Sequence, residues 1–104
     1  MTDSEYSLDV LHAKLAAAEE SGQWLLLSSL EVARALNAFL AGEITKEEIA
    51  DWAEFHDAND GVAFETNEAI PAVIFAISSP EINGWLDNAR ARQLLSDLHA
   101  LRSP

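Results

Sequence analysis

The residues best suited to chemistry in this sequence are three histidines, and their spacing does not bring them together. His12, His56 and His99 lie on three different predicted helices. Carboxylate-bridged metal sites in helical bundles use Glu-x-x-His pairs, and the nearest match is Asp9-x-x-His12. That pair supplies only two ligands, so we expect no metal site. His56 lies on an apolar helix face, where a histidine is more often a core-edge residue than a catalytic base.

A second candidate is the run Asp57, Asn59, Asp60 and Gly61, which has the residue types that open a calcium-binding loop. In such a loop the glycine falls at the sixth position and a bidentate glutamate at the twelfth. Counted from Asp57, Glu68 fits the twelfth position, but the glycine falls at the fifth. An Asx turn is the better interpretation. The sequence also has no phosphate-binding loop and no nucleophile elbow, so we predict neither an enzyme nor a cofactor.

The most unusual feature is a segment of concentrated negative charge. Between Glu43 and Glu68 the chain has nine acidic residues and one basic residue, Lys46. Like charges four residues apart on a helix destabilise it by about 0.2 to 0.5 kcal/mol, so local stability does not explain the segment. Two interpretations stay open: a solvated surface that keeps a small protein soluble, and an interface for a cationic partner.

A predicted helix from Thr45 to about Ala58 would position these charges. Thr45 and Glu48 have the spacing of a capping box. At about 100° per residue, the apolar and acidic residues of this helix fall on opposite sides. The apolar side has Ile49, Trp52, Ala53 and His56, and the acidic side has Glu47, Asp51 and Glu54. Phe55 projects toward the acidic side, where we expect an exposed aromatic anchor.

The rest of the chain predicts further helices. The first two are expected at Leu8 to Glu20 and from Ser28 to the stop at Gly42. The others are expected at Thr66 to Ser78, in one turn at Ser79 to Ile82, and from the cap Asp87 to Leu101. Thr66 to Ser78 is apolar on every side and is therefore expected to be a central, buried helix. Trp24 to Leu27 either extends the second helix or lies over the core. Trp24, Trp52 and Trp85 are expected in the core or at its edge.

Length and composition limit the fold and the partners. A chain of 104 residues suits one domain, so we predict an all-α, single-domain antiparallel bundle of four to five helices over residues 1–104. The net charge of −12 argues against nucleic acid or an anionic membrane as the main partner. There is no cysteine, no signal-peptide pattern and no apolar stretch longer than Ala69 to Ile77. These features favour a soluble, cytoplasmic protein.

The stretch from Leu36 to Ile49 resembles a known family. It contains Phe39-Leu40-Ala41-Gly42-Glu43-Ile44, followed by the capped acidic helix. This pattern is similar to that of small bacterial immunity proteins of the colicin D immunity type, in which an apolar helix ends in Phe-Leu-x-Gly-x-Ile. The resemblance implies a helical bundle that inhibits a nuclease toxin by placing carboxylates where RNA phosphates would bind. It implies that role for Glu43, Glu47, Asp51 and Glu54.

The sequence therefore predicts an acidic inhibitor that binds a basic protein, with a toxin nuclease domain as the suspected partner. The expected contact residues are Glu43, Glu47, Asp51, Glu54, Phe55 and Asp57. A DNA mimic that occupies a nucleic-acid-binding protein is the alternative. A small enzyme that depends on a metal or on His56 comes third.

Overall fold

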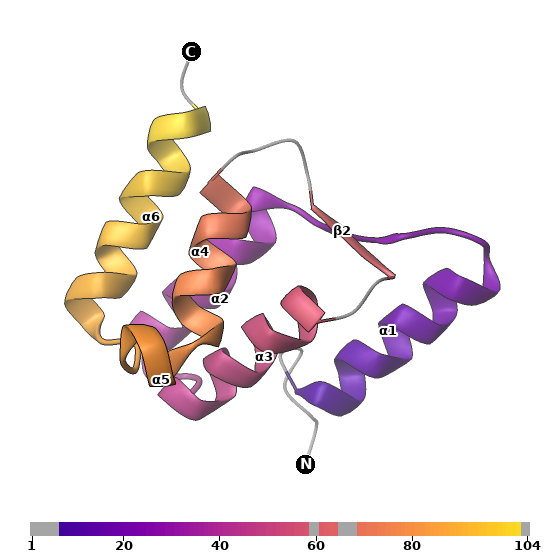
Figure 1. The fold of residues 1–104 in the computed structure, drawn as a ribbon, viewed down its shortest axis with the longest axis horizontal. Coiled ribbons are helices and arrows are strands. Elements are labelled where there is room, and N and C mark those ends of the chain that lie inside the picture. Colours follow the sequence, from indigo (N-terminus) through magenta and orange to yellow (C-terminus); the bar gives the residue numbers. More distant parts are fainter. Residues whose placement is uncertain (1–6, 59–60, 65–68, 103–104) are drawn as a thin grey trace.

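A computed structural model describes residues 7–58, 61–64 and 69–102, and most of these residues are helical. In order, the elements are α1 (Leu8–Glu20), β1 (Leu25–Leu27), α2 (Ser29–Leu40), α3 (Lys46–Ala58), β2 (Val62–Phe64), α4 (Ala69–Ser78), α5 (Pro80–Asn83) and α6 (Asn88–Arg102). Figure 1 shows α1 lying to one side of α3, and α6 at the opposite end of the molecule beside α4. The predominantly helical fold is confirmed.

The helix boundaries follow the predicted caps. The Ser28 hydroxyl accepts a hydrogen bond from the Glu31 amide at 3.2 Å, which fixes the start of α2. Before α3, the Thr45 hydroxyl accepts from the Glu48 amide at 3.1 Å, and the Glu48 carboxylate accepts from the Thr45 amide at 2.9 Å. These reciprocal bonds form the predicted capping box. At the start of α6, the Asp87 carboxylate accepts a hydrogen bond from the Arg90 amide at 2.8 Å and so caps the helix.

Gly42 ends α2 as predicted. Its φ is +79°, a left-handed conformation that glycine adopts without steric cost. The next amide, that of Glu43, then donates to the Ala38 carbonyl at 2.9 Å. This bond satisfies a carbonyl that the end of the helix would otherwise leave unpaired. The turn also sets the direction in which the chain enters α3.

A two-stranded parallel sheet is present that the sequence did not predict. Leu25, Leu26 and Leu27 of β1 pair with Val62, Ala63 and Phe64 of β2 in that order. Parallel strands need a crossover between them, and here α2 and α3 provide it. Trp24 to Leu27 therefore does not extend α2. Leu25–Leu27 pairs as a strand and lies against the core, with Leu27 buried in it and Leu25 packed against it.

The core lies where α3 meets α4 and where α2 meets α6, and α1 covers another side of α3. Leu36, Ile49, Ile70, Ile74 and Leu98 are among its fully buried side chains. Five helices, α1, α2, α3, α4 and α6, and the strand β1 contribute side chains to this one buried cluster. The finer expectation, an antiparallel bundle of four to five helices, stays a prediction.

Several aromatic residues lie elsewhere than expected. Trp24 is 66% exposed and Trp85 is 47% exposed, so only Trp52 of the three tryptophans is in the core. Phe75 is 48% exposed, so α4 is not buried on every side. In the described part of the chain, no helix combines the length and the apolar character needed to cross a bilayer.

Candidate functional site

The exposed surface of α3 carries a row of carboxylates. We call Glu43, Glu47, Asp51, Glu54 and Asp57 the acidic strip, and all five side chains are exposed. Residues three or four apart on a helix are neighbours, with Cβ atoms about 5 to 6 Å apart. Glu47, Asp51, Glu54 and Asp57 follow this spacing along α3, and Glu43 precedes the helix. The four residues of the strip on α3 therefore form a continuous line of negative charge.

Tertiary packing limits the part of α3 that is exposed. Six residues of the helix are buried, namely Ile49, Ala50, Trp52, Ala53, Phe55 and His56. They spread over a wide arc because α4 packs against one side of α3 and α1 against another (Figure 1). The acidic strip lies on the part that remains accessible to solvent, which also holds Lys46, Glu48 and Ala58.

The prediction that Phe55 is an exposed anchor in this surface is wrong. Its side chain is only 4% exposed. The rings of Phe55 and of His12 in α1 are nearly perpendicular, with their centroids 4.9 Å apart, and the centroids of the Phe55 and His56 rings are 5.3 Å apart. The spacing within α3 could not reveal this burial, because α1 covers Phe55 from outside the helix.

A groove beside the acidic strip contains a different aromatic residue. Asp51, Glu54 and Asp57 form one wall, and Ser79, Pro80 and Trp85 from the segment around α5 line the other side. The groove has a volume of about 370 Å³. The half-exposed Trp85 therefore lies beside three carboxylates. It is an exposed aromatic residue next to the acidic strip, which is what the sequence predicts of Phe55.

Lys46 shows that this aromatic ring can hold a cation. Its Nζ lies 5.4 Å from the centroid of the Trp85 ring, within the range of a cation–π contact. Lys46 is the first residue of α3 and is exposed. The contact brings together α3 and the segment before α6, which the sequence alone could not place side by side.

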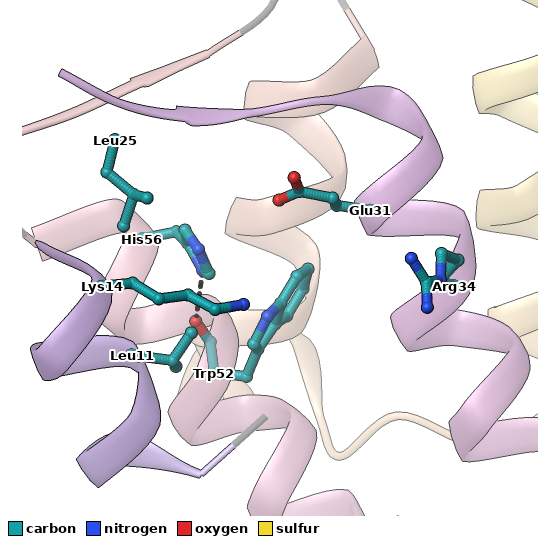
Figure 2. Close-up of a pocket in the computed structure, with 7 residues that line it drawn as sticks. All are labelled: Leu11, Lys14, Leu25, Glu31, Arg34, Trp52 and His56. Atoms are coloured by element: carbon teal, nitrogen blue, oxygen red, sulfur yellow. Dashed lines mark hydrogen bonds between the residues drawn. The ribbon is translucent and has the colours of Figure 1, made fainter. Parts of the chain in front are cut away.

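On another side of α3 the structure has a smaller pocket with a different character. It is lined by Leu11, Lys14, Leu25, Glu31, Arg34, Trp52 and His56, and its volume is about 100 Å³. Figure 2 shows Lys14 reaching from α1 toward Trp52, and Glu31 pointing from α2 toward the same space. We call it the His56 pocket. Trp52 and His56 project from α3 opposite Glu47, so the pocket and the acidic strip lie on different faces.

His56 is a buried histidine with a fixed orientation. Its Nδ1 lies 2.8 Å from the Trp52 carbonyl oxygen (Figure 2). A carbonyl only accepts, so Nδ1 carries the proton in the neutral ring and Nε2 is left as an acceptor. Burial lowers the pKa of His56 below 6.5; the hydrogen bond to Trp52 opposes this effect, and the positive charge of Lys14 adds to it. His56 is therefore neutral at pH 7, as a core-edge histidine would be.

The described residues offer no metal centre, since no three His, Asp or Glu side chains among them are arranged around a common point. Asn59, Asp60 and Glu68 of the calcium-loop hypothesis lie outside the described residues, and so does the side chain of His99. His12 and His56 approach each other through Phe55, an arrangement that their separation in the sequence did not indicate.

Comparison with known proteins identifies no relative of this chain, because no family model, no curated protein and no solved structure matches it. The geometry of the two sites is therefore the basis for a proposed function.

Proposed function

We propose that this protein is an acidic inhibitor that binds a basic protein through the acidic strip, as an immunity protein does with a nuclease toxin. The observation that carries the proposal is the groove in which Asp51, Glu54 and Asp57 face Trp85. A row of carboxylates can occupy cationic residues that would otherwise bind RNA phosphates. The aromatic ring adds the kind of contact that dominates affinity at protein interfaces.

The distribution of charge supports an interface more than a merely soluble surface. Carboxylates near the C-terminal end of a helix are opposed by the helix dipole, and Glu54 and Asp57 lie in that half of α3. Solubility alone would be served by acidic residues anywhere on the surface. Their alignment beside a half-exposed tryptophan gives a partner both charge and an apolar contact.

The proposed contact residues are the acidic strip together with Trp85, and Phe55 contributes only by supporting α3 from within the core. Glu43, Glu47, Asp51, Glu54 and Asp57 would pair with basic side chains of the partner. The natural site of action would be the cytoplasm, where an inhibitor of this kind protects the cell that makes the toxin. No cofactor is required for this role.

The experiment measures whether the protein inhibits the partner that it binds. The protein is used to isolate its partner from the cells that produce it, and cleavage of RNA by that partner is then measured. We expect a basic nuclease domain, full inhibition by the wild type, and loss of inhibition when Glu47, Asp51 and Glu54 are all changed to Lys.

The matched control changes three exposed acidic residues elsewhere, Glu19, Glu20 and Asp97, to Lys. Both variants alter the net charge equally, so a difference between them reports position rather than total charge. Equal inhibition by both variants would contradict the proposal. A partner that binds DNA and has no nuclease activity would favour the DNA-mimic alternative.

A further inference from the structure

The His56 pocket concentrates positive charge in a strongly acidic protein. The chain has only six lysine and arginine residues, and two of them, Lys14 and Arg34, line this one small pocket. They come from different helices, α1 and α2, so their meeting is a consequence of the fold. Glu31 is the single acidic residue in the lining.

The buried part of the lining is largely apolar, and its polar side-chain groups are the indole N–H of Trp52 and the ring of His56. Leu11 and Trp52 are buried, and Leu25 of β1 is half-buried. His56 is 4% exposed, and its Nδ1 is already bonded to the Trp52 carbonyl. A ligand that reaches these residues would therefore meet hydrocarbon, the Trp52 indole and an imidazole whose Nε2 is the nitrogen not bonded to the Trp52 carbonyl.

We propose that this pocket binds a small organic carboxylate, with Lys14 and Arg34 at its mouth and the Nε2–H of a protonated His56 as a donor from its floor. The volume of about 100 Å³ is smaller than the engineered cavity of about 150 Å³ that holds benzene. It suits a ligand of the size of acetate or propionate. The methyl or ethyl group would contact Leu11 and Leu25. This inference is independent of the acidic strip and of the function proposed for it.

Proton uptake follows from the hydrogen-bonding geometry. With Nδ1 bonded to a carbonyl, neutral His56 can only accept at Nε2, and a carboxylate also only accepts. The two can bond only after Nε2 gains a proton. The free pocket disfavours that proton because His56 is buried, whereas a bound anion favours it. Carboxylate affinity should therefore rise as the pH falls.

Among the described residues, few other ionisable groups lie around His56. The elements packed against it contribute His12 and Lys14 from α1 and Glu31 and Arg34 from α2, and β1 contributes none. His12 and His56 both contact the ring of Phe55. Glu31 opposes the binding of an anion and is therefore the informative residue to neutralise.

The experiment is a titration of the whole protein with propionate, followed by the NMR signals of the His56 ring at about pH 5.5 and about pH 7.5, where the carboxylate is ionised. We expect a saturable shift, with a dissociation constant on the order of millimolar, as suits so small a ligand. The affinity should be up to about tenfold higher per unit decrease in pH. Lys14→Met should weaken it by about three- to tenfold, and Glu31→Gln should strengthen it.

Lys46→Met removes the same charge far from the pocket and is the matched control, expected to bind as the wild type does. Propionamide, which has nearly the same shape and no charge, should cause no saturable shift. The proposal is overturned if propionate causes none at either pH, if the affinity does not depend on pH, if Lys14→Met and Lys46→Met behave alike, or if propionamide binds equally well.

Discussion

The ring of Phe55 lies inside the protein, with its centroid 4.9 Å from that of His12 and 5.3 Å from that of His56. A phenylalanine in this position stabilises the junction of α1 with α3. Trp85, in contrast, lies at the surface. Nearly half of it is exposed, and it lies beside the carboxylates of the groove. The two aromatic residues should therefore have separable roles in stability and in binding.

We expect Phe55→Ala to lower the free energy of unfolding by about 3 to 5 kcal/mol, the usual cost of removing a buried aromatic side chain. Trp85→Ala should cost about 1 kcal/mol or less, since little of the core depends on it. Urea denaturation followed by circular dichroism measures both. A large loss of stability for Trp85→Ala and none for Phe55→Ala would reverse the two assignments.

His56 makes stability depend on pH in a defined direction. Its pKa is below 6.5 in the folded protein, so near that pH the unfolded chain binds more protons than the folded one. Acidification therefore favours unfolding. The free energy of unfolding should be constant above about pH 7 as far as His56 is concerned, and should fall below about pH 6.5 by up to about 1.4 kcal/mol per pH unit.

Urea denaturation at several pH values between about 7 and about 5 tests this expectation, because most carboxylates titrate at lower pH. His56→Asn keeps a donor close to the position of Nδ1 and should make the slope shallower. His12→Asn removes an exposed histidine and is the matched control. An unchanged slope in His56→Asn would show that His56 is not the group responsible.

Among the helices and strands, the features that could be predicted are those determined by residues close together in the sequence. The caps at Ser28, Thr45 and Asp87 need only a side chain and an amide three residues later, so the sequence placed them correctly. The pairing of Leu25 with Val62 joins strands of three residues each from distant parts of the chain. So short a run has no readable alternation, which is why the strand at Leu25–Leu27 was not distinguished from a helix extension.

Part of the candidate site could also be predicted from the sequence. Helical spacing correctly placed Glu47, Asp51 and Glu54 on an exposed face, because that requires only the period of the helix. It could not show that Trp85 would stand beside them, or that Lys14 and Arg34 would share a pocket with His56. Those arrangements depend on how separate helices pack, and that information is not local.

Close packing of α1 against the start of β2 gives a prediction about the sheet. A Cβ atom added at Gly61 would lie 2.8 Å from Cδ1 of the buried Leu15, so that side chain would have to move. We expect Gly61→Ala to lower the free energy of unfolding by about 1 to 3 kcal/mol, as overpacking does.

A double-mutant cycle tests the cause. Leu15→Ala opens the space that the new methyl group needs, so the double variant should lose less stability than the sum of the two single changes. Additive losses would show that contact with Leu15 is not the cause of the destabilisation.

At the scale of the whole molecule, two faces of opposite character share α3. The acidic strip and the groove at Trp85 lie on one face, and the His56 pocket with two of the six basic residues lies on another. The net charge of −12 should attract a basic partner from a distance. The position of the strip should then decide where that partner docks.

The central claim is that the acidic strip, and not the total charge, directs binding to a basic partner. The most direct test is the association rate with the isolated partner at low and at physiological salt. The wild type is compared with the variant in which Glu47, Asp51 and Glu54 are Lys, and with the control in which Glu19, Glu20 and Asp97 are Lys. We predict that the strip variant associates about tenfold or more slowly and with a weaker dependence on salt, while the control stays close to the wild type. Equal association rates for the two variants would contradict the claim, because they would show that α3 has no special part in binding.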